Sequence, residues 1–139
     1  MTDETIDDIK ERKVEQLRNQ QMGAGDEGGG ADEAPDEPIY LDDAGHLDEI
    51  VDSYDVVLAD FFADWCGPCK MVAPIVEDVA AETDAAAAKV DVDEYQRLAT
   101  QYGVQGVPTL VVFADGQPAE RLVGAQGKEQ LFGAVRKHL

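Results

Sequence analysis

Cysteine is scarce in this chain of 139 residues, which contains only two. A structural zinc site needs four thiol or imidazole ligands. Beyond the two cysteines the chain could offer only His46 and His138, which we expect to be ordinary surface residues. The sequence therefore argues against a metal site and leaves a single possible cysteine pair.

Basic residues are also few, since 11 Lys and Arg stand against 30 Asp and Glu, for a net charge of −19. Nucleic acid and anionic membranes are therefore poor partners, because phosphate binding needs clustered Lys and Arg. A chain this acidic repels itself at low salt, whereas molar salt shortens the Debye length to about 3 Å and screens the repulsion. The composition favours a halophilic, salt-rich cytoplasm. The alternative is an ordinary acidic protein whose charge serves only solubility.

Long apolar runs are missing as well. No stretch approaches the roughly 18 apolar residues of a transmembrane helix. Residues 1–8 are acidic and lack the apolar segment of a secretory signal. We therefore expect a cytoplasmic protein, in which two closely spaced cysteines are typical of redox chemistry rather than of a structural disulfide.

Composition divides the chain into three segments. The charge pattern of residues 1–22 predicts a helix, with acids at its start and bases later, as the helix dipole prefers. Residues 23–38 are rich in Gly, Asp, Glu and Pro, so we expect a disordered, flexible linker that contributes nothing to a core. Residues 39–139 carry the apolar patterns of a folded domain.

Within residues 39–139 the patterns alternate between strands and helices. Strands are predicted at 39–41, 56–62, 86–92, 109–113 and 118–123, and helices at 47–54, 68–82, 94–102 and 127–138. The last two strands form a hairpin around Asp115-Gly116. This order predicts an α/β fold, with a central mixed β-sheet covered by helices on both faces.

Both cysteines lie in the segment WCGPCK, residues 65–70, where a buried strand gives way to a helix. Unpaired N–H groups at a helix start lower the pKa of a thiol, so Cys66 is expected to be an accessible, reactive thiolate. Cys69 follows one turn later, where we expect it to be less exposed and able to attack a mixed disulfide on Cys66. Gly67 would permit the close approach, and Pro68 suits the first helical turn.

Asp60 interrupts the most apolar strand of the chain, residues 56–62. A buried lone carboxylate is costly, so we expect Asp60 to have a raised pKa or a charged partner. The alternative is an aspartate at the strand end that reaches solvent.

These features together resemble the thioredoxin family over residues 39–139. The similarity rests on residues 65–70, on Asp60 six positions before Cys66, on Pro74 and on Val107-Pro108-Thr109. A bare pair of cysteines at this spacing is a weak signal, but the combination is specific. The resemblance implies a thioredoxin fold and a protein-disulfide reductase whose dithiol is Cys66 and Cys69, with no cofactor because the electrons reside on the sulfurs.

The resemblance also implies roles for other residues. Asp60 would accept the proton of Cys69, and Lys89 would approach Asp60. Pro108 would be cis and lie against the disulfide, while the Val107 backbone would pair with an extended substrate segment. Residues expected to face the substrate are Trp65, Gly67, Pro68, Val107, Pro108 and Gly124. For Trp65 a loosely packed surface position is the alternative, and for Gly124 a simple turn.

The partners implied by the resemblance are disulfide-containing proteins and a thioredoxin-reductase-type electron donor, with the chain as a monomer. One departure is Phe62, which stands where many members of the family carry a second tryptophan. The extension of residues 1–38 has no counterpart in the minimal family domain. It leaves open an alternative function, a redox-regulated adaptor whose N-terminal helix recruits or gates partners.

Overall fold

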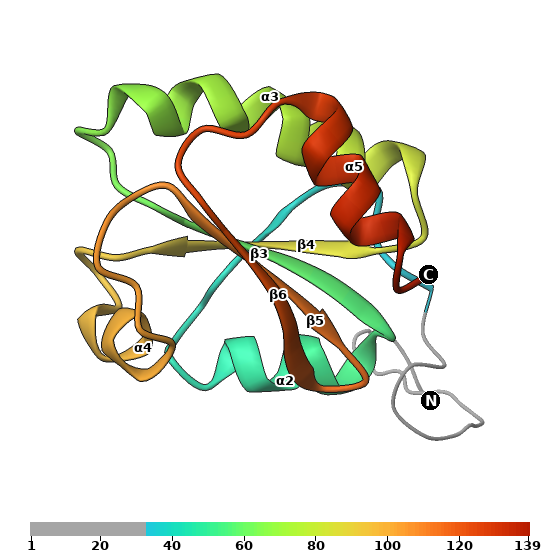
Figure 1. Ribbon diagram of the computed structural model, residues 1–139. Helices are drawn as coiled ribbons and strands as arrows, with labels where there is room; N and C mark the ends of the chain where they lie inside the picture. The colour runs from blue at the N-terminus through green and yellow to red at the C-terminus, as the bar shows by residue number, and fades with distance from the viewer. Residues whose placement is uncertain (1–32) are drawn as a thin grey trace. The chain divides into compact units, whose positions relative to one another are not determined.

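The computed structural model describes residues 33–139 (Figure 1). The elements are β2 (Ile39–Tyr40), α2 (His46–Ser53), β3 (Val56–Phe62), α3 (Gly67–Glu82), β4 (Ala86–Asp91), α4 (Gln96–Gln101), β5 (Thr109–Ala114), β6 (Gln117–Val123) and α5 (Lys128–Arg136). Their predicted order is confirmed, and each boundary lies within two residues of the prediction. The predicted helix of residues 1–22 and most of the predicted linker fall outside the described residues.

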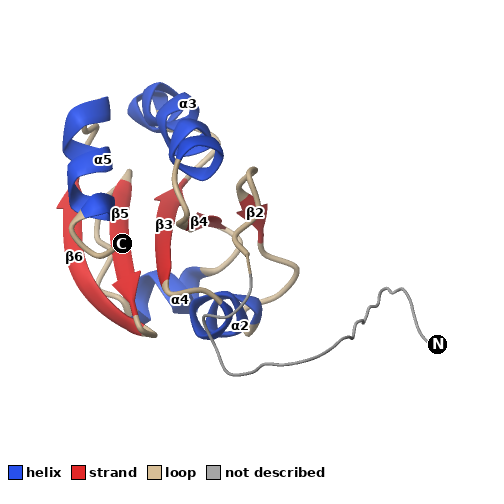
Figure 2. Ribbon diagram, turned by 90° about the vertical axis from the view of Figure 1, so that its right-hand side faces the viewer, coloured by secondary structure: helices blue, strands red, loops and turns tan. Residues whose placement is uncertain are grey.

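The five strands of this part of the chain form one sheet in the order β2-β4-β3-β5-β6. β2, β4 and β3 run parallel to one another. β5 is antiparallel to its neighbour β3, and β6 is antiparallel to β5. Helices α3 and α5 cover one face and α2 and α4 the other, as the two views show (Figures 1 and 2). The predicted mixed sheet with helices on both faces is therefore confirmed.

Side chains of β3 alternate between two cores. Val56 and Leu58 pack beneath α3 and α5, whereas Val57 and Phe61 pack against α2 and α4. A strand buried on both faces needs apolar residues at nearly every position, which explains the unbroken run. By the same alternation Asp60 lies on the face covered by α3.

The turn between β5 and β6 follows from its two residues. Asp115 has φ of 54° and Gly116 of 83°, both in the left-handed region that tight hairpin turns require. Glycine adopts this conformation without steric cost, and aspartate tolerates it better than most residues. The predicted hairpin is confirmed.

One expectation about the linker is wrong. Ala34 is half-buried and packs against the core beneath α2 and α4, so the chain before β2 contributes to the folded domain. Its methyl group is a small apolar contact that the polar composition of residues 23–38 concealed. Within residues 33–139, no helix has the length and apolar character needed to cross a membrane.

Candidate active site

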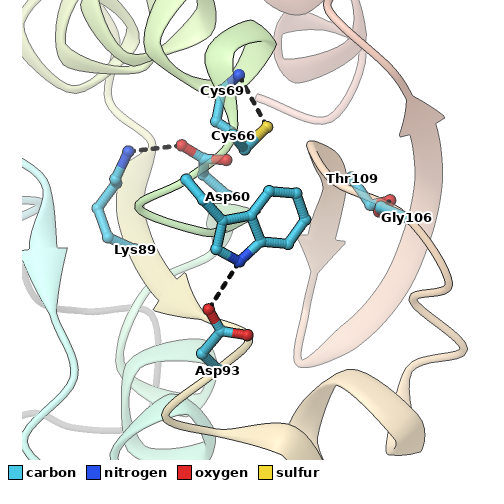
Figure 3. Close-up of a disulfide and its surroundings, with 8 residues drawn as sticks. Asp60, Cys66, Cys69, Lys89, Asp93, Gly106 and Thr109 are labelled. Carbon is cyan, nitrogen blue, oxygen red and sulfur yellow. Dashed lines mark hydrogen bonds and ion pairs between the residues drawn. A yellow bond between two sulfur atoms is a disulfide. The ribbon is translucent and has the colours of Figure 1, made fainter.

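The two cysteines form a disulfide at the start of α3 (Figure 3). Their Cα atoms are 5.3 Å apart. Cys66 is the N-cap residue of the helix, and its sulfur accepts a hydrogen bond from the backbone N–H of Cys69 at 3.1 Å. A sulfur that receives a helix N-terminal N–H is in a position that stabilises the thiolate once the disulfide is reduced.

Both cysteines are buried in this oxidised form, with 3% of Cys66 and 4% of Cys69 exposed. The predictions that Cys66 is accessible and Cys69 less exposed are therefore wrong for the disulfide state. The reason is packing, because Cys66 and Cys69 cluster with the buried Ala63, and Phe62, Val92 and Val107 lie against this cluster. None of these contacts could be read from residues 65–70 alone.

Gly67 and Pro68, between the two cysteines, are both exposed. A Cβ on Gly67 would meet no atom within 4 Å, so the cysteines do not need a glycine there for their own approach. The expected reason for Gly67 is thus wrong. Because Gly67 has no side chain, nothing projects from the surface beside the disulfide at this position.

Asp60 is fully buried, and its Oδ2 accepts a hydrogen bond from Lys89 Nζ at 2.6 Å. Burial raises the pKa of Asp60, and the attraction of Lys89 opposes that rise without cancelling it. Both expectations for this residue are confirmed, and the solvent-exposed alternative is wrong. Its second oxygen, Oδ1, has no hydrogen-bond partner.

The peptide bond between Val107 and Pro108 is cis, as the family resemblance implied. The Thr109 hydroxyl donates a hydrogen bond to the Gly106 carbonyl at 2.6 Å, closing the turn around this bond (Figure 3). The Gly124 N–H donates to the Pro108 carbonyl at 2.8 Å. Since Val107 packs against the cysteines, the structure brings Val107, Pro108 and Gly124 to the same site.

Trp65 is 70% exposed, yet its orientation is held by a hydrogen bond. Its Nε1 donates to Asp93 Oδ2 at 2.9 Å, and Asp91 Oδ1 accepts the N–H of Asp93 at 2.9 Å. Sequence reasoning missed Asp93. The available signal was its place just after β4, because the loops that follow parallel strands meet at one edge of a sheet.

The histidines are not the ordinary surface residues that we expected. His46 Nδ1 accepts a hydrogen bond from the Asp42 N–H at 3.0 Å. His138 Nε2 lies 2.9 Å from Glu120 Oε2, and this hydrogen bond is the main cause of the lowered pKa of Glu120. Both rings are partly buried, and each fixes a chain segment. No group of three or more metal-ligating side chains occurs in residues 33–139.

Comparison with known proteins decides what this geometry means. The family model named thioredoxin matches residues 37–137. The chain belongs to the thioredoxin family. The thioredoxin of Mycobacterium tuberculosis is 48% identical over 96 residues, which are 68% of this chain and 83% of that protein. The thioredoxin of Staphylococcus aureus is 51% identical over 86 residues, 60% of this chain and 83% of that protein.

Solved thioredoxin structures agree. A mutant thioredoxin from Halobacterium salinarum is 53% identical with a TM-score of 0.74, covering 78% of this chain and 96% of that one. A thioredoxin from Schistosoma mansoni is 30% identical with a TM-score of 0.70, covering 76% and 99%. The fold is therefore the thioredoxin fold. With a disulfide at the CGPC position, the chain is a thiol–disulfide oxidoreductase that acts as a protein-disulfide reductase.

Proposed function

We propose that Cys66 attacks the substrate disulfide and that Cys69 resolves the intermediate. The observation that carries this assignment is the Cys66 sulfur at the N-cap of α3, where it accepts the Cys69 N–H. A thiolate at this position is favoured over the thiol, and the thiolate is the attacking species. Cys69 lies within the first turn of α3, so its own sulfur gains less from the helix start.

The exchange proceeds in two steps. The Cys66 thiolate attacks one sulfur of the substrate, forming a mixed disulfide and releasing the other substrate sulfur as a thiolate, which takes a proton from water. Cys69 then loses its proton and attacks the Cys66 sulfur, which releases the second substrate thiolate. Two electrons pass to the substrate, and the chain is left with the Cys66–Cys69 disulfide seen in the structure.

Asp60 is the proposed acceptor of the Cys69 proton. Its Oδ1 is buried and unpaired, so it has a free lone pair for that proton. Burial raises the pKa of Asp60 toward the neutral pH at which the protein works, and a general base is most effective when its pKa lies near the working pH. Lys89 holds the other oxygen and keeps the carboxylate in place.

The proposed substrate surface surrounds the disulfide. Val107 makes no backbone hydrogen bond within residues 33–139, so its N–H and C=O remain free to pair with an extended substrate segment. The exposed Trp65 borders this surface as a wall. The low rim is assigned to Gly67, Pro68 and Gly124, whereas Pro108 is buried and acts on the substrate surface by fixing the backbone of Val107.

The proposed setting follows from charge and chemistry. Thirty acids against 11 bases, and the similarity to a Halobacterium salinarum thioredoxin, support a salt-rich cytoplasm. Because the electrons reside on sulfur, the reaction requires no bound cofactor. A thioredoxin-reductase-type donor returns two electrons to the disulfide, so the chain acts as an electron carrier, and the proposed form is the monomer.

Substitution of each cysteine tests the assignment. With a disulfide-containing protein such as insulin, Cys69→Ser should accumulate a stable mixed disulfide, whereas Cys66→Ser should form none. Neither variant should turn over. Asp60→Asn should leave formation of the mixed disulfide unchanged and slow its resolution. A mixed disulfide trapped on Cys69 would reverse the two roles, and an unchanged resolution rate would remove Asp60 from the mechanism.

A further inference from the structure

Three residues of neighbouring strands form a row beneath α3. Tyr40 of β2 pairs with Lys89 of β4, and Lys89 pairs with Asp60 of β3. Residues paired in register point to the same face of a sheet. Lys89 is only 6% exposed, so its ammonium group is largely withdrawn from water.

Phe62 completes this group. It follows Asp60 by two residues on β3 and so lies on the same face. Lys89 Nζ is 4.6 Å from the centroid of the Phe62 ring. The Tyr40 ring meets the Phe62 ring edge-on, with centroids 6.5 Å apart and an interplanar angle of 89°. Phe62 also packs against the cluster formed by Ala63, Cys66 and Cys69, so it adjoins both the disulfide site and the ion pair.

The Phe62 ring offers the buried Lys89 ammonium a favourable contact that partly replaces its lost hydration. Withdrawing an ammonium from water costs free energy that one carboxylate repays only in good geometry. Asp60 is the one hydrogen-bond partner of Lys89 Nζ among the described residues. The negative face of an aromatic ring within about 6 Å attracts a cation, and more strongly where water is excluded. An edge-on contact such as that of Tyr40 is a favourable aromatic pairing that restrains the ring.

We propose that Phe62, braced by Tyr40, is a positioning residue that holds the Lys89 ammonium against the Asp60 carboxylate. Phe62, which stands where many members of the family carry tryptophan, would thus help to position the charged groups of the site. Its effect on catalysis rests on the proposed role of Asp60, but its effect on the ion pair does not.

The consequence concerns the proton on Asp60. The titratable or charged groups on this face are Lys89 and Asp91 from β4, Tyr40 from β2 and the Cys66–Cys69 pair from α3, while β5 places the apolar Leu110 opposite Asp60. Asp91 lies opposite Phe62, and its Oδ1 accepts the backbone N–H of Asp93. Among residues 33–139, Lys89 is the only group whose charge lowers the pKa of Asp60. If the ring is lost, Lys89 is held less firmly and Asp60 should bind its proton more tightly.

A double-mutant cycle tests this in the oxidised protein. Carbon-13 NMR would follow the Asp60 carboxyl through a pH titration in the wild type, Phe62→Leu, Lys89→Met and the double variant. We expect Phe62→Leu to raise the midpoint by roughly 0.5–1 pH unit and Lys89→Met to raise it further. In the Lys89→Met background, Phe62→Leu should add nothing, because the ring acts through the ammonium. Phe62→Trp, which keeps an aromatic face, should retain the wild-type midpoint.

A shift of the same size with and without Lys89 would overturn the proposal, because it would mean that Phe62 only controls burial. Tyr40→Leu is a second variant, since the 64% exposed Tyr40 can be replaced without opening the core. It should move the midpoint in the same direction by less, and unchanged midpoints in both variants would also overturn the proposal. These titrations need no substrate. A failure here is therefore distinguishable from a failure of the Asp60 role, which the resolution rate of Asp60→Asn reports.

Discussion

Asp60 and Lys89 place opposite charges 2.6 Å apart, with almost no exposure to water. Removing both ions from solvent costs more than their attraction returns, as the raised pKa of Asp60 indicates. A pair of apolar residues in this sheet would give a more stable fold. The carboxylate therefore reduces stability at the position where thiol–disulfide exchange needs a base.

Asp60→Asn should stabilise the fold in a pH-dependent manner. Because the pKa of Asp60 is raised above 3.8, the folded chain binds this proton more tightly than the unfolded chain. The resulting stability is complete below the unfolded pKa and is lost as the pH rises through the folded pKa. Between these two pKa values, the free energy of unfolding falls by about 1.4 kcal/mol for each unit of pH. Asparagine resembles the protonated acid, so its advantage should be larger at pH 8 than at pH 4.

Urea denaturation at the two pH values, at constant salt, would measure this difference in the free energy of unfolding. Asp48→Asn, at an exposed position of α2, is the control for the loss of one negative charge at the surface. An equal gain from Asp60→Asn at both pH values would contradict the prediction.

At the scale of elements, α4 depends on a residue far along the chain. This helix has six residues and no side-chain N-cap. It ends at Gln101, and Gly103, whose φ is 68°, follows its C-cap residue Tyr102. The Arg121 guanidinium of β6 donates hydrogen bonds to the carbonyl oxygens of Tyr102 and Gly103. The Tyr102 ring contacts Phe61 and Phe113. An edge strand thus fixes the start of the segment that leads to the cis peptide bond.

Arg121→Ala should lower the free energy of unfolding by about 1–2 kcal/mol, because two carbonyls lose a charged donor at a partly solvated site. Arg121→Lys should recover only part of this, since an ammonium cannot reproduce the fork geometry of two guanidinium nitrogens. Urea denaturation would measure both. Arg97→Ala, an exposed arginine on α4, is the control, and equal losses at Arg97 and Arg121 would contradict the prediction.

The elements were predictable because each depends on local pattern. The apolar run of β3 and the Asp115-Gly116 turn both express preferences within a few residues. The contacts of Arg121 with Tyr102, and of Trp65 with Asp93, join residues 19 and 28 positions apart, and no periodicity specifies them. Such pairings arise only after the strands are arranged.

The site was predictable to a different degree. Asp60 was visible as a charge in an apolar strand, but its pairing with Lys89 and the cis bond before Pro108 came from family resemblance, not from local pattern. The burial of Cys66 was missed because it depends on side chains from separate parts of the chain, such as Val92 and Val107. A motif specifies the reacting atoms, whereas tertiary packing determines their access to solvent.

For the whole molecule, the dominant property is surface charge. The net charge is −19, and within residues 33–139 the only buried charged side chains are Asp60 and Lys89. The remaining charges of this region therefore face solvent wholly or in part, where like charges repel at low ionic strength. A folded chain holds these charges closer together than an unfolded chain does. Screening should therefore favour the folded state.

We expect the free energy of unfolding to increase between about 0.1 M and 1 M NaCl, over which the Debye length falls from roughly 10 Å to 3 Å. Thermal or urea denaturation at several salt concentrations would measure the slope. A variant with Asp48→Asn, Glu49→Gln and Asp52→Asn, which neutralises exposed acids of α2, should show a shallower slope. An identical slope would mean that general salt effects, not charge repulsion, control the stability.

Trp65 is the single tryptophan of the chain, it adjoins Cys66, and its indole is tethered to Asp93 rather than enclosed in a core. Its emission therefore arises from one defined place, next to the sulfur atoms whose bonding changes in each cycle. The fluorescence of Trp65 therefore reports on the redox state of the two cysteines. Oxidation and reduction can be followed in real time, without a dye, a label or a coupled enzyme.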